Sequence, residues 1–169
     1  QFEVFGGSGY DIACAGADGP IVYRKLDDEI RYVECDFDPN FGENLFFMWL
    51  GKKQNTQEEI MVYNRNGQSV KKQDVVAKIS EITNAILECN VLTEFELLIQ
   101  KHENIISDLI QKPKVKSELF PDFWGQIKSL GAWGGDFVLV TSAESLEKTK
   151  QYFEQKGFNV IYKYKDFVL

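Results

Sequence analysis

The last third of the chain carries the pattern that most restricts its fold: an apolar strand, an amphipathic helix, a glycine turn and a second strand. The first strand is predicted over "DFVLVTS" (Asp136 to Ser142) and the helix over Ala143 to Lys156. The turn falls at Gly157, and the second strand follows over "FNVIYKY" (Phe158 to Tyr164). These elements in this order form a split β-α-β unit, in which a helix covers one face of a sheet. We therefore expect an α+β fold.

Two amphipathic helices are predicted upstream of this unit. Apolar residues recur at helical spacing from Val75 to Leu87 and again from Thr93 to Ile110. Each segment therefore has one apolar face, and the two helices should pack together. Thr93 and Glu96 have the spacing of a capping box, which predicts that the second helix begins at Thr93.

The segment after these helices contains two prolines, Pro113 and Pro121, which interrupt the helical pattern. A short helix is expected from Trp124 to Leu130. The aromatic side chains of "FPDFWG" (Phe120 to Gly125) have two interpretations. In the first interpretation they form a partner surface, since aromatic residues are enriched at interfaces. In the second they are core anchors beneath a proline-bounded turn.

Three short β-rich stretches stand nearer the N-terminus and predict a three-stranded meander, at Ile21 to Leu26, Ile30 to Phe37 and Leu45 to Lys52. The third is apolar almost throughout, which favours a central strand covered on both faces. The polar segment that follows, Gly51 to Ile60, is either a loop at the rim of a site or a solvated connection.

Charge and hydropathy restrict the partners. Acidic residues outnumber basic ones by 26 to 19, for a net charge of −7, and no basic block is interleaved with aromatics, so a nucleic-acid partner is disfavoured. The longest apolar run, Leu45 to Gly51, is too short to span a bilayer, and nothing resembles a signal peptide. We expect no membrane partner and a cytoplasmic location.

The metal-ligating residue types are sparse. Cys14, Cys35 and Cys89 are widely spaced, which favours reduced, mostly buried thiols over disulfides or zinc. His102 is the only histidine, and on a helix it is more often packed or hydrogen-bonded than a ligand. We expect no metal site in these residues.

Two glycine-rich segments are the candidate ligand sites: "GGSGYD" (Gly6 to Asp11) and "GAWGGD" (Gly131 to Asp136). Glycine permits positive φ and lets a ligand approach backbone N–H groups, as a phosphate cradle requires, although either segment could be only a tight turn. The first segment does not fit a dinucleotide-binding fingerprint, and it lacks the Gly-Lys-Ser/Thr of a P-loop.

With both segments in view, the chain resembles the C-terminal half of a GHMP kinase. Gly9-Tyr10-Asp11-Ile12-Ala13 is similar to the motif of the mevalonate kinase-like bacterial branch called GYDIA, and "KSLGAWGGD" (Lys128 to Asp136) to the family's late Lys-x-Thr-Gly-Ala-Gly-Gly-Gly-Gly loop. The phrase "KHENIISDL" resembles the Asn-x-Asn-His-x-Leu-Leu helix of mevalonate kinases. The chain departs from the late loop at Leu130, Trp133 and Asp136, where the family has threonine, glycine and glycine.

The resemblance implies a fold and a domain organisation. Residues 21–169 would form the GHMP kinase C-terminal domain, a ferredoxin-like two-layer sandwich of an antiparallel sheet and helices. Residues 1–20 would be the end of an N-terminal S5-like kinase domain carrying the GYDIA motif. The family's Pro-x-x-x-Gly-Leu-Gly-Ser-Ser-Ala-Ala phosphate loop is not among these residues, and Gln1 is not an initiator methionine. We expect a fragment that is inactive by itself.

The resemblance also implies an activity: transfer of the γ-phosphoryl group of ATP to the hydroxyl of a small-molecule alcohol, with ATP and Mg²⁺ as cofactors. Asp11 would be the catalytic residue that accepts or orients the hydroxyl proton. Substrate or phosphate would be bound by five further residues: Gly9, Lys128, Gly131, Gly134 and Gly135. The expected protein partner is the N-terminal half or a second copy in a homodimer. The alternative function is a non-catalytic, ferredoxin-like ligand-binding or assembly module.

Overall fold

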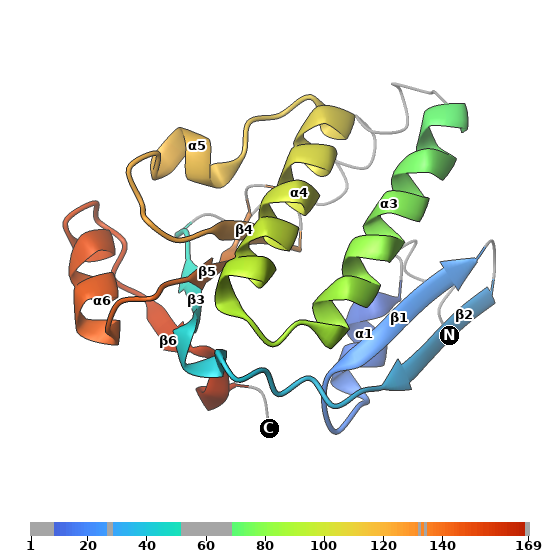
Figure 1. The fold of residues 1–169 in the computed structure, drawn as a ribbon, viewed down its shortest axis with the longest axis horizontal. Helices are drawn as coiled ribbons and strands as arrows, with labels where there is room; N and C mark the ends of the chain where they lie inside the picture. Colours follow the sequence, from blue (N-terminus) through green and yellow to red (C-terminus); the bar gives the residue numbers. More distant parts are fainter. Residues whose placement is uncertain (1–8, 27–28, 52–68, 132, 134, 168–169) are drawn as a thin grey trace. The chain divides into compact units, whose positions relative to one another are not determined.

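The structure is a computed structural model of the 169-residue chain, and it describes residues 9–26, 29–51, 69–131, 133 and 135–167 (Figure 1). The chain divides into two compact units: Gln1–Asp38 with Lys165–Leu169, and Pro39–Tyr164. We describe each unit by itself. The division expected after residue 20 stays a prediction.

The first unit contains a short helix and a β-hairpin. Helix α1 spans Tyr10–Ala15, and strands β1 (Ile21–Leu26) and β2 (Glu29–Glu34) pair antiparallel, with Tyr23 opposite Tyr32. The predicted three-stranded meander is wrong, because these two strands form a sheet of their own. All of β2 except its second residue is exposed.

The second unit contains a four-stranded sheet of order β4-β5-β3-β6 in which every neighbouring pair is antiparallel. The strands are β3 (Leu45–Trp49), β4 (Ile127–Leu130), β5 (Phe137–Thr141) and β6 (Ile161–Lys163). Because β3 lies between β5 and β6 and is antiparallel to both, these two strands are parallel. Helix α6 (Leu146–Glu154) connects them, which confirms the predicted split β-α-β unit. Short 3₁₀ turns occupy Gly42–Asn44 and Tyr164–Asp166.

The hydrophobic core lies between one face of this sheet and the segments around α5 and α6. Phe46 and Met48 of β3 are buried opposite Val140 and Val138 of β5. The core also contains Ile127, Val115, Phe120, Phe123, Phe153 and Ile161. Strand β3 is central, as predicted, but Trp49 is 42% exposed, so the expected cover on both faces is incomplete.

The aromatic segment between α5 and β4 belongs mainly to this core. Phe120 and Phe123 are buried, and both pack against Phe153 of α6, with ring centroids 5.0 and 4.8 Å from it. Trp124 is 42% exposed. The two phenylalanines are therefore core anchors.

Helices α3 (Ser69–Glu88) and α4 (Leu92–Ile110) pack side by side, as predicted (Figure 1). The predicted capping box at the start of α4 is wrong. The residue before the helix is Val91, and no side chain caps the helix. Glu96 instead accepts a hydrogen bond of 2.6 Å from the Thr141 hydroxyl of β5. The Glu96 carboxylate, which the local pattern assigned to the helix cap, is therefore bound in a tertiary contact with β5.

The helix predicted from Trp124 to Leu130 is also wrong. The short helix is α5 (Val115–Leu119), and β4 occupies the end of the predicted helix. Ile127 and Ser129 are buried whereas Lys128 and Leu130 are partly exposed, which is the two-residue period of a strand. Four residues are too few to distinguish this period from a helical one.

The thiols only partly follow expectation. All three are free, but only Cys89 is buried, while Cys35 is partly exposed and Cys14 is exposed. Cys14 lies on α1, where only Ala13 is buried, so the expectation of mostly buried thiols is wrong. Within the described residues, no helix is long and apolar enough to cross a membrane. Except for Gly51, the polar segment up to Ile60 lies outside the described residues.

Candidate functional site

The first predicted site segment is the start of α1. Gly9 has φ 79° and ψ 0°, a left-handed conformation that glycine adopts without steric cost, and its carbonyl accepts the N–H of Ala13. Asp11 stands in the first helical turn and is exposed. Its carboxylate is therefore accessible to a ligand.

The aromatic neighbour of this aspartate is tied to the hairpin. The rings of Tyr10 and Tyr23 meet edge to face, with centroids 6.0 Å apart. Burial raises the pKa of the Tyr10 hydroxyl, and the neighbouring Cys14 and Asp11 raise it further. The ring contact connects the start of α1 to β1, so it fixes the turn of helix from which Asp11 projects.

The second predicted segment lies along β4 and the turn after it. Gly131 directly follows the strand with φ 66°, and a side chain added there would meet open space, so its backbone conformation alone favours glycine. Lys128 is partly buried on β4, and its Nζ donates a 3.1 Å hydrogen bond to the Ser129 carbonyl. Gly135 is buried, and Gly134 lies outside the described residues.

Lys128 has unusual electrostatics for a lysine. Burial lowers the pKa of its ammonium group, and the carboxylate of Glu103 acts in the opposite direction. Desolvation disfavours the charged form, so the lysine gains more than an exposed one from a bound anion. This side chain is thus suited to contact a negatively charged group beside β4.

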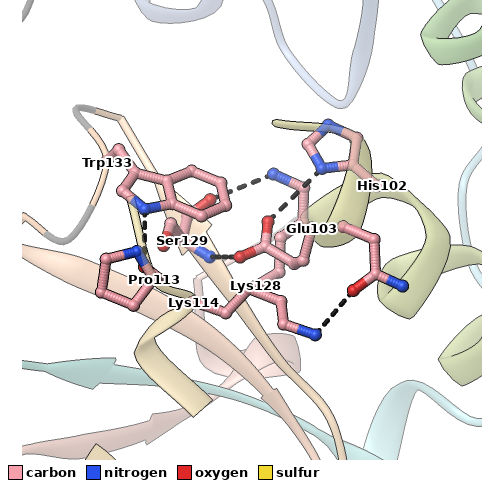
Figure 2. A network of polar contacts seen from close by, with 8 residues as sticks. His102, Glu103, Pro113, Lys114, Lys128, Ser129 and Trp133 are labelled. Carbon is pink, nitrogen blue, oxygen red and sulfur yellow. Dashed lines mark hydrogen bonds and ion pairs between the residues drawn. The ribbon is translucent and has the colours of Figure 1, made fainter. Parts of the chain in front are cut away.

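A buried carboxylate is the centre of the polar cluster beside β4. Figure 2 shows the Glu103 carboxylate of α4 directed at the Ser129 backbone, whose N–H donates to Oε2 over 3.2 Å. His102 Nδ1 lies 3.4 Å from the other oxygen, Oε1, without hydrogen-bond alignment. Glu103 is 2% exposed, and its Oε1 has no hydrogen-bond partner among the described residues. The cluster therefore retains an acceptor whose hydrogen-bonding capacity is not used.

Trp133 also belongs to the network drawn in Figure 2. Its indole N–H donates a 3.0 Å hydrogen bond to the Pro113 carbonyl beyond the end of α4 (Figure 2). The loop after β4 is thereby joined to the segment that leads into α5.

The predicted site residues fall in both units. Gly9 and Asp11 lie together in the first, whereas Lys128, Gly131 and Gly135 lie along one strand and turn of the second. Sequence reasoning missed Glu103. Its signal was present, because Glu103 continues the series Phe95 and Ile99 along the buried face of α4 at four-residue spacing.

The fold of the chain is similar to that of a solved structure, a crystal structure of a Lin0012 protein from Listeria innocua. The TM-score is 0.70 and the sequence identity is 19%. The match covers 92% of this chain and 56% of that chain, so the chain spans just over half the length of the protein it matches. At this identity the likeness concerns the fold alone. No protein-family model and no curated protein matches the chain.

Proposed function

We propose that the intact protein is an ATP-dependent small-molecule kinase of the GHMP type, mevalonate kinase-like, acting on an alcohol. The observation that carries this proposal is the conformation of the two motif glycines. Gly9 is left-handed two residues before the exposed Asp11, and Gly131 is left-handed at the end of the strand that carries Lys128. Both glycine motifs thus have a backbone that other residues rarely adopt.

The strand order of the second unit supports the same proposal. The order β4-β5-β3-β6, with a split β-α-β unit at its C-terminal end, is the arrangement expected of a ferredoxin-like sandwich. In this proposal the second unit is the GHMP kinase C-terminal domain. The start of α1 belongs to the end of the preceding S5-like domain.

Phosphoryl transfer depends on positioning and charge neutralisation more than on covalent chemistry. Asp11 accepts or orients the proton of the substrate hydroxyl, and the adjacent Gly9 leaves room for the substrate. Lys128 contributes positive charge toward the substrate or phosphate. Magnesium-bound ATP supplies the phosphoryl group. By resemblance, the metal and the phosphates are held by residues that precede this sequence.

The role of Asp11 is tested by Asp11→Asn in the intact protein, with ADP release followed over a panel of mevalonate-like and sugar alcohols. We expect kcat to fall by about 10²-fold or more, because a positioned general base contributes roughly this factor. Asp18→Asn is the matched control, since Asp18 is also exposed in the first unit and should retain activity. Wild-type turnover by Asp11→Asn would refute the assigned role.

The alternative, a non-catalytic binding or assembly module, is favoured by the exposed Trp124 and the Lys148 ammonium 5.5 Å from its ring centroid. Calorimetric titration of the intact protein with magnesium–ATP separates the two functions. A kinase should release or absorb heat on saturable nucleotide binding, whereas a pure interaction module should not. The 169-residue chain alone should not turn over ATP, so measurable activity from it would contradict the proposed division of the site.

A further inference from the structure

The second unit contains a cavity of about 250 Å³ at the start of β4, between α4 and α5. Its polar lining residues are Gln100, Glu103, Lys114, Lys116, Ser117 and Gln126. Binding pockets for drug-sized ligands begin at about 300 Å³, so this cavity suits a smaller metabolite. Gly131 lies beyond the other end of β4, and Lys128 is not among the lining residues, so the proposed kinase function does not use this cavity.

Two lysines place a net positive charge in this wall of an acidic protein. Lys114 Nζ donates to Asn104 Oδ1 over 2.6 Å, and Lys116 Nζ donates to the Gly125 carbonyl over 2.6 Å. Both acceptors are neutral, and no carboxylate of the described residues forms an ion pair with either lysine. Two ammonium groups and one carboxylate, that of Glu103, thus line the cavity, which leaves its lining with one excess positive charge.

The positions of these lysines are set by the core. Val115 between them is buried, so the chain on both sides of it is anchored. Burial lowers the pKa of Lys116, the Glu96 carboxylate opposes this, and the neighbouring Lys114 ammonium lowers it further. The two positive charges repel each other in a partly desolvated place. A bound dianion would remove that repulsion.

The inner wall adds an acceptor. Glu103 lines the cavity and is 2% exposed, and its Oε1 lies 3.4 Å from His102 Nδ1 but accepts no hydrogen bond from the described residues. A carboxylate oxygen accepts hydrogen bonds only, so the ligand group that meets it must be a donor. A ligand that satisfies the cavity therefore combines a dianionic group with a hydroxyl.

We propose that this cavity binds the phosphate monoester of a small alcohol. The phosphate lies between the ammonium groups of Lys114 and Lys116, and a ligand hydroxyl donates to Glu103 Oε1. A phosphate monoester carries a charge of about −1.5 to −2 at pH 7. This charge matches two ammonium groups better than the single negative charge of a carboxylate ligand would. The Ser117 hydroxyl and the amide groups of Gln100 and Gln126 supply further donors around the phosphate.

The experiment is an NMR titration of the ¹⁵N-labelled chain with glycerol 3-phosphate at constant pH and ionic strength. We expect saturable shifts of the backbone amides around Lys116 and Gln126, with a dissociation constant on the order of 1 mM. Lys114→Gln and Lys116→Gln should each weaken binding by about tenfold or more, since each removes a charge-assisted hydrogen bond. Lys101→Gln, the same charge change on an exposed residue of α4, should leave it unchanged.

Each other outcome counts against the proposal. Shifts that do not saturate, or that Lys101→Gln reduces as much as Lys114→Gln, indicate general charge attraction and overturn it. Saturable binding that neither Lys114→Gln nor Lys116→Gln weakens places the ligand elsewhere. Inorganic phosphate should bind more weakly than glycerol 3-phosphate, and equal affinity would overturn the role of Glu103. If Lys116→Gln unfolds through loss of its bond to Gly125, Lys114→Gln decides, because its partner Asn104 is exposed.

Discussion

The Ser129 backbone N–H donates a hydrogen bond to the Glu103 carboxylate, which is buried against β4 from a position 26 residues earlier in the chain. The contact fastens α4 to the strand that carries Lys128. A buried carboxylate is costly unless it is hydrogen-bonded, so this bond stabilises both the helix position and the strand.

Truncating this carboxylate should destabilise the second unit. We expect Glu103→Ala to lower the free energy of unfolding by roughly 1–3 kcal/mol, because the Ser129 N–H loses its acceptor in a buried place. Glu103→Gln keeps an oxygen for that bond and should lose less. Urea unfolding measures both. Glu94→Ala, an exposed residue of the same helix, should change stability by less than about 0.5 kcal/mol, and an equal loss there would contradict this account.

Gly125 should not tolerate any side chain. A Cβ added at Gly125 would lie 1.8 Å from the Thr141 carbonyl oxygen. Gly125→Ala must therefore move the segment that leads into β4 away from the end of β5. We expect a loss of about 3 kcal/mol or more in thermal or urea unfolding. Gly131→Ala meets open space but has φ 66°, and should cost only about 1–2 kcal/mol. The reverse ranking of the two variants would show that the strand approach is looser than described.

Lys128 should make stability depend on pH in alkaline solution. Burial lowers its pKa in the folded state, whereas the unfolded chain titrates near the ordinary value of 10.5. Between these values the unfolded state binds more protons, so stability rises with pH across that window. Urea unfolding at increasing pH up to 10.5 should show a steeper rise in stability for the wild type than for Lys128→Met. If stability rises equally with pH in the wild type and in Lys128→Met, Lys128 is solvated and this account is wrong. The control Lys101→Met should show the same rise as the wild type.

Asp122 should contribute to stability against acid. The Tyr152 hydroxyl donates to the Asp122 carboxylate over 2.7 Å, and Lys156 Nζ lies 3.0 Å from it. Both contacts lower the pKa of Asp122, and the hydrogen bond from Tyr152 has the larger effect. The contribution is therefore present above the ordinary value of 3.8 and lost as the pH falls through the lowered one. Asp122→Asn should lose less stability than the wild type below pH 3.8. The control Asp108→Asn should follow the wild type.

The elements of the fold that the sequence predicts well are those that a local pattern defines. The apolar periodicity of α3 and α4 extends over many turns, so the pattern identifies both helices and their contact. The split unit of β5, α6 and β6 follows from an apolar strand, an amphipathic segment and Gly157, which adopts φ 87°. The roles of the glycine motifs and of Asp11 remain predictions.

The sequence by itself determined the α+β class, the helical pair and the split unit, because each depends on side chains a few residues apart. Only the tertiary structure decided three features. These are the pairing partners of β3, the strand that follows Gly125, and the hydrogen-bond partner of Glu96. Glu96 meets Thr141 across 45 residues, and Glu103 meets Ser129 across 26. Strand pairing and buried polar contacts join segments that are distant in the sequence. Their contribution to stability outweighs local secondary-structure propensity, and no short stretch of sequence contains both partners, so no local pattern reveals them.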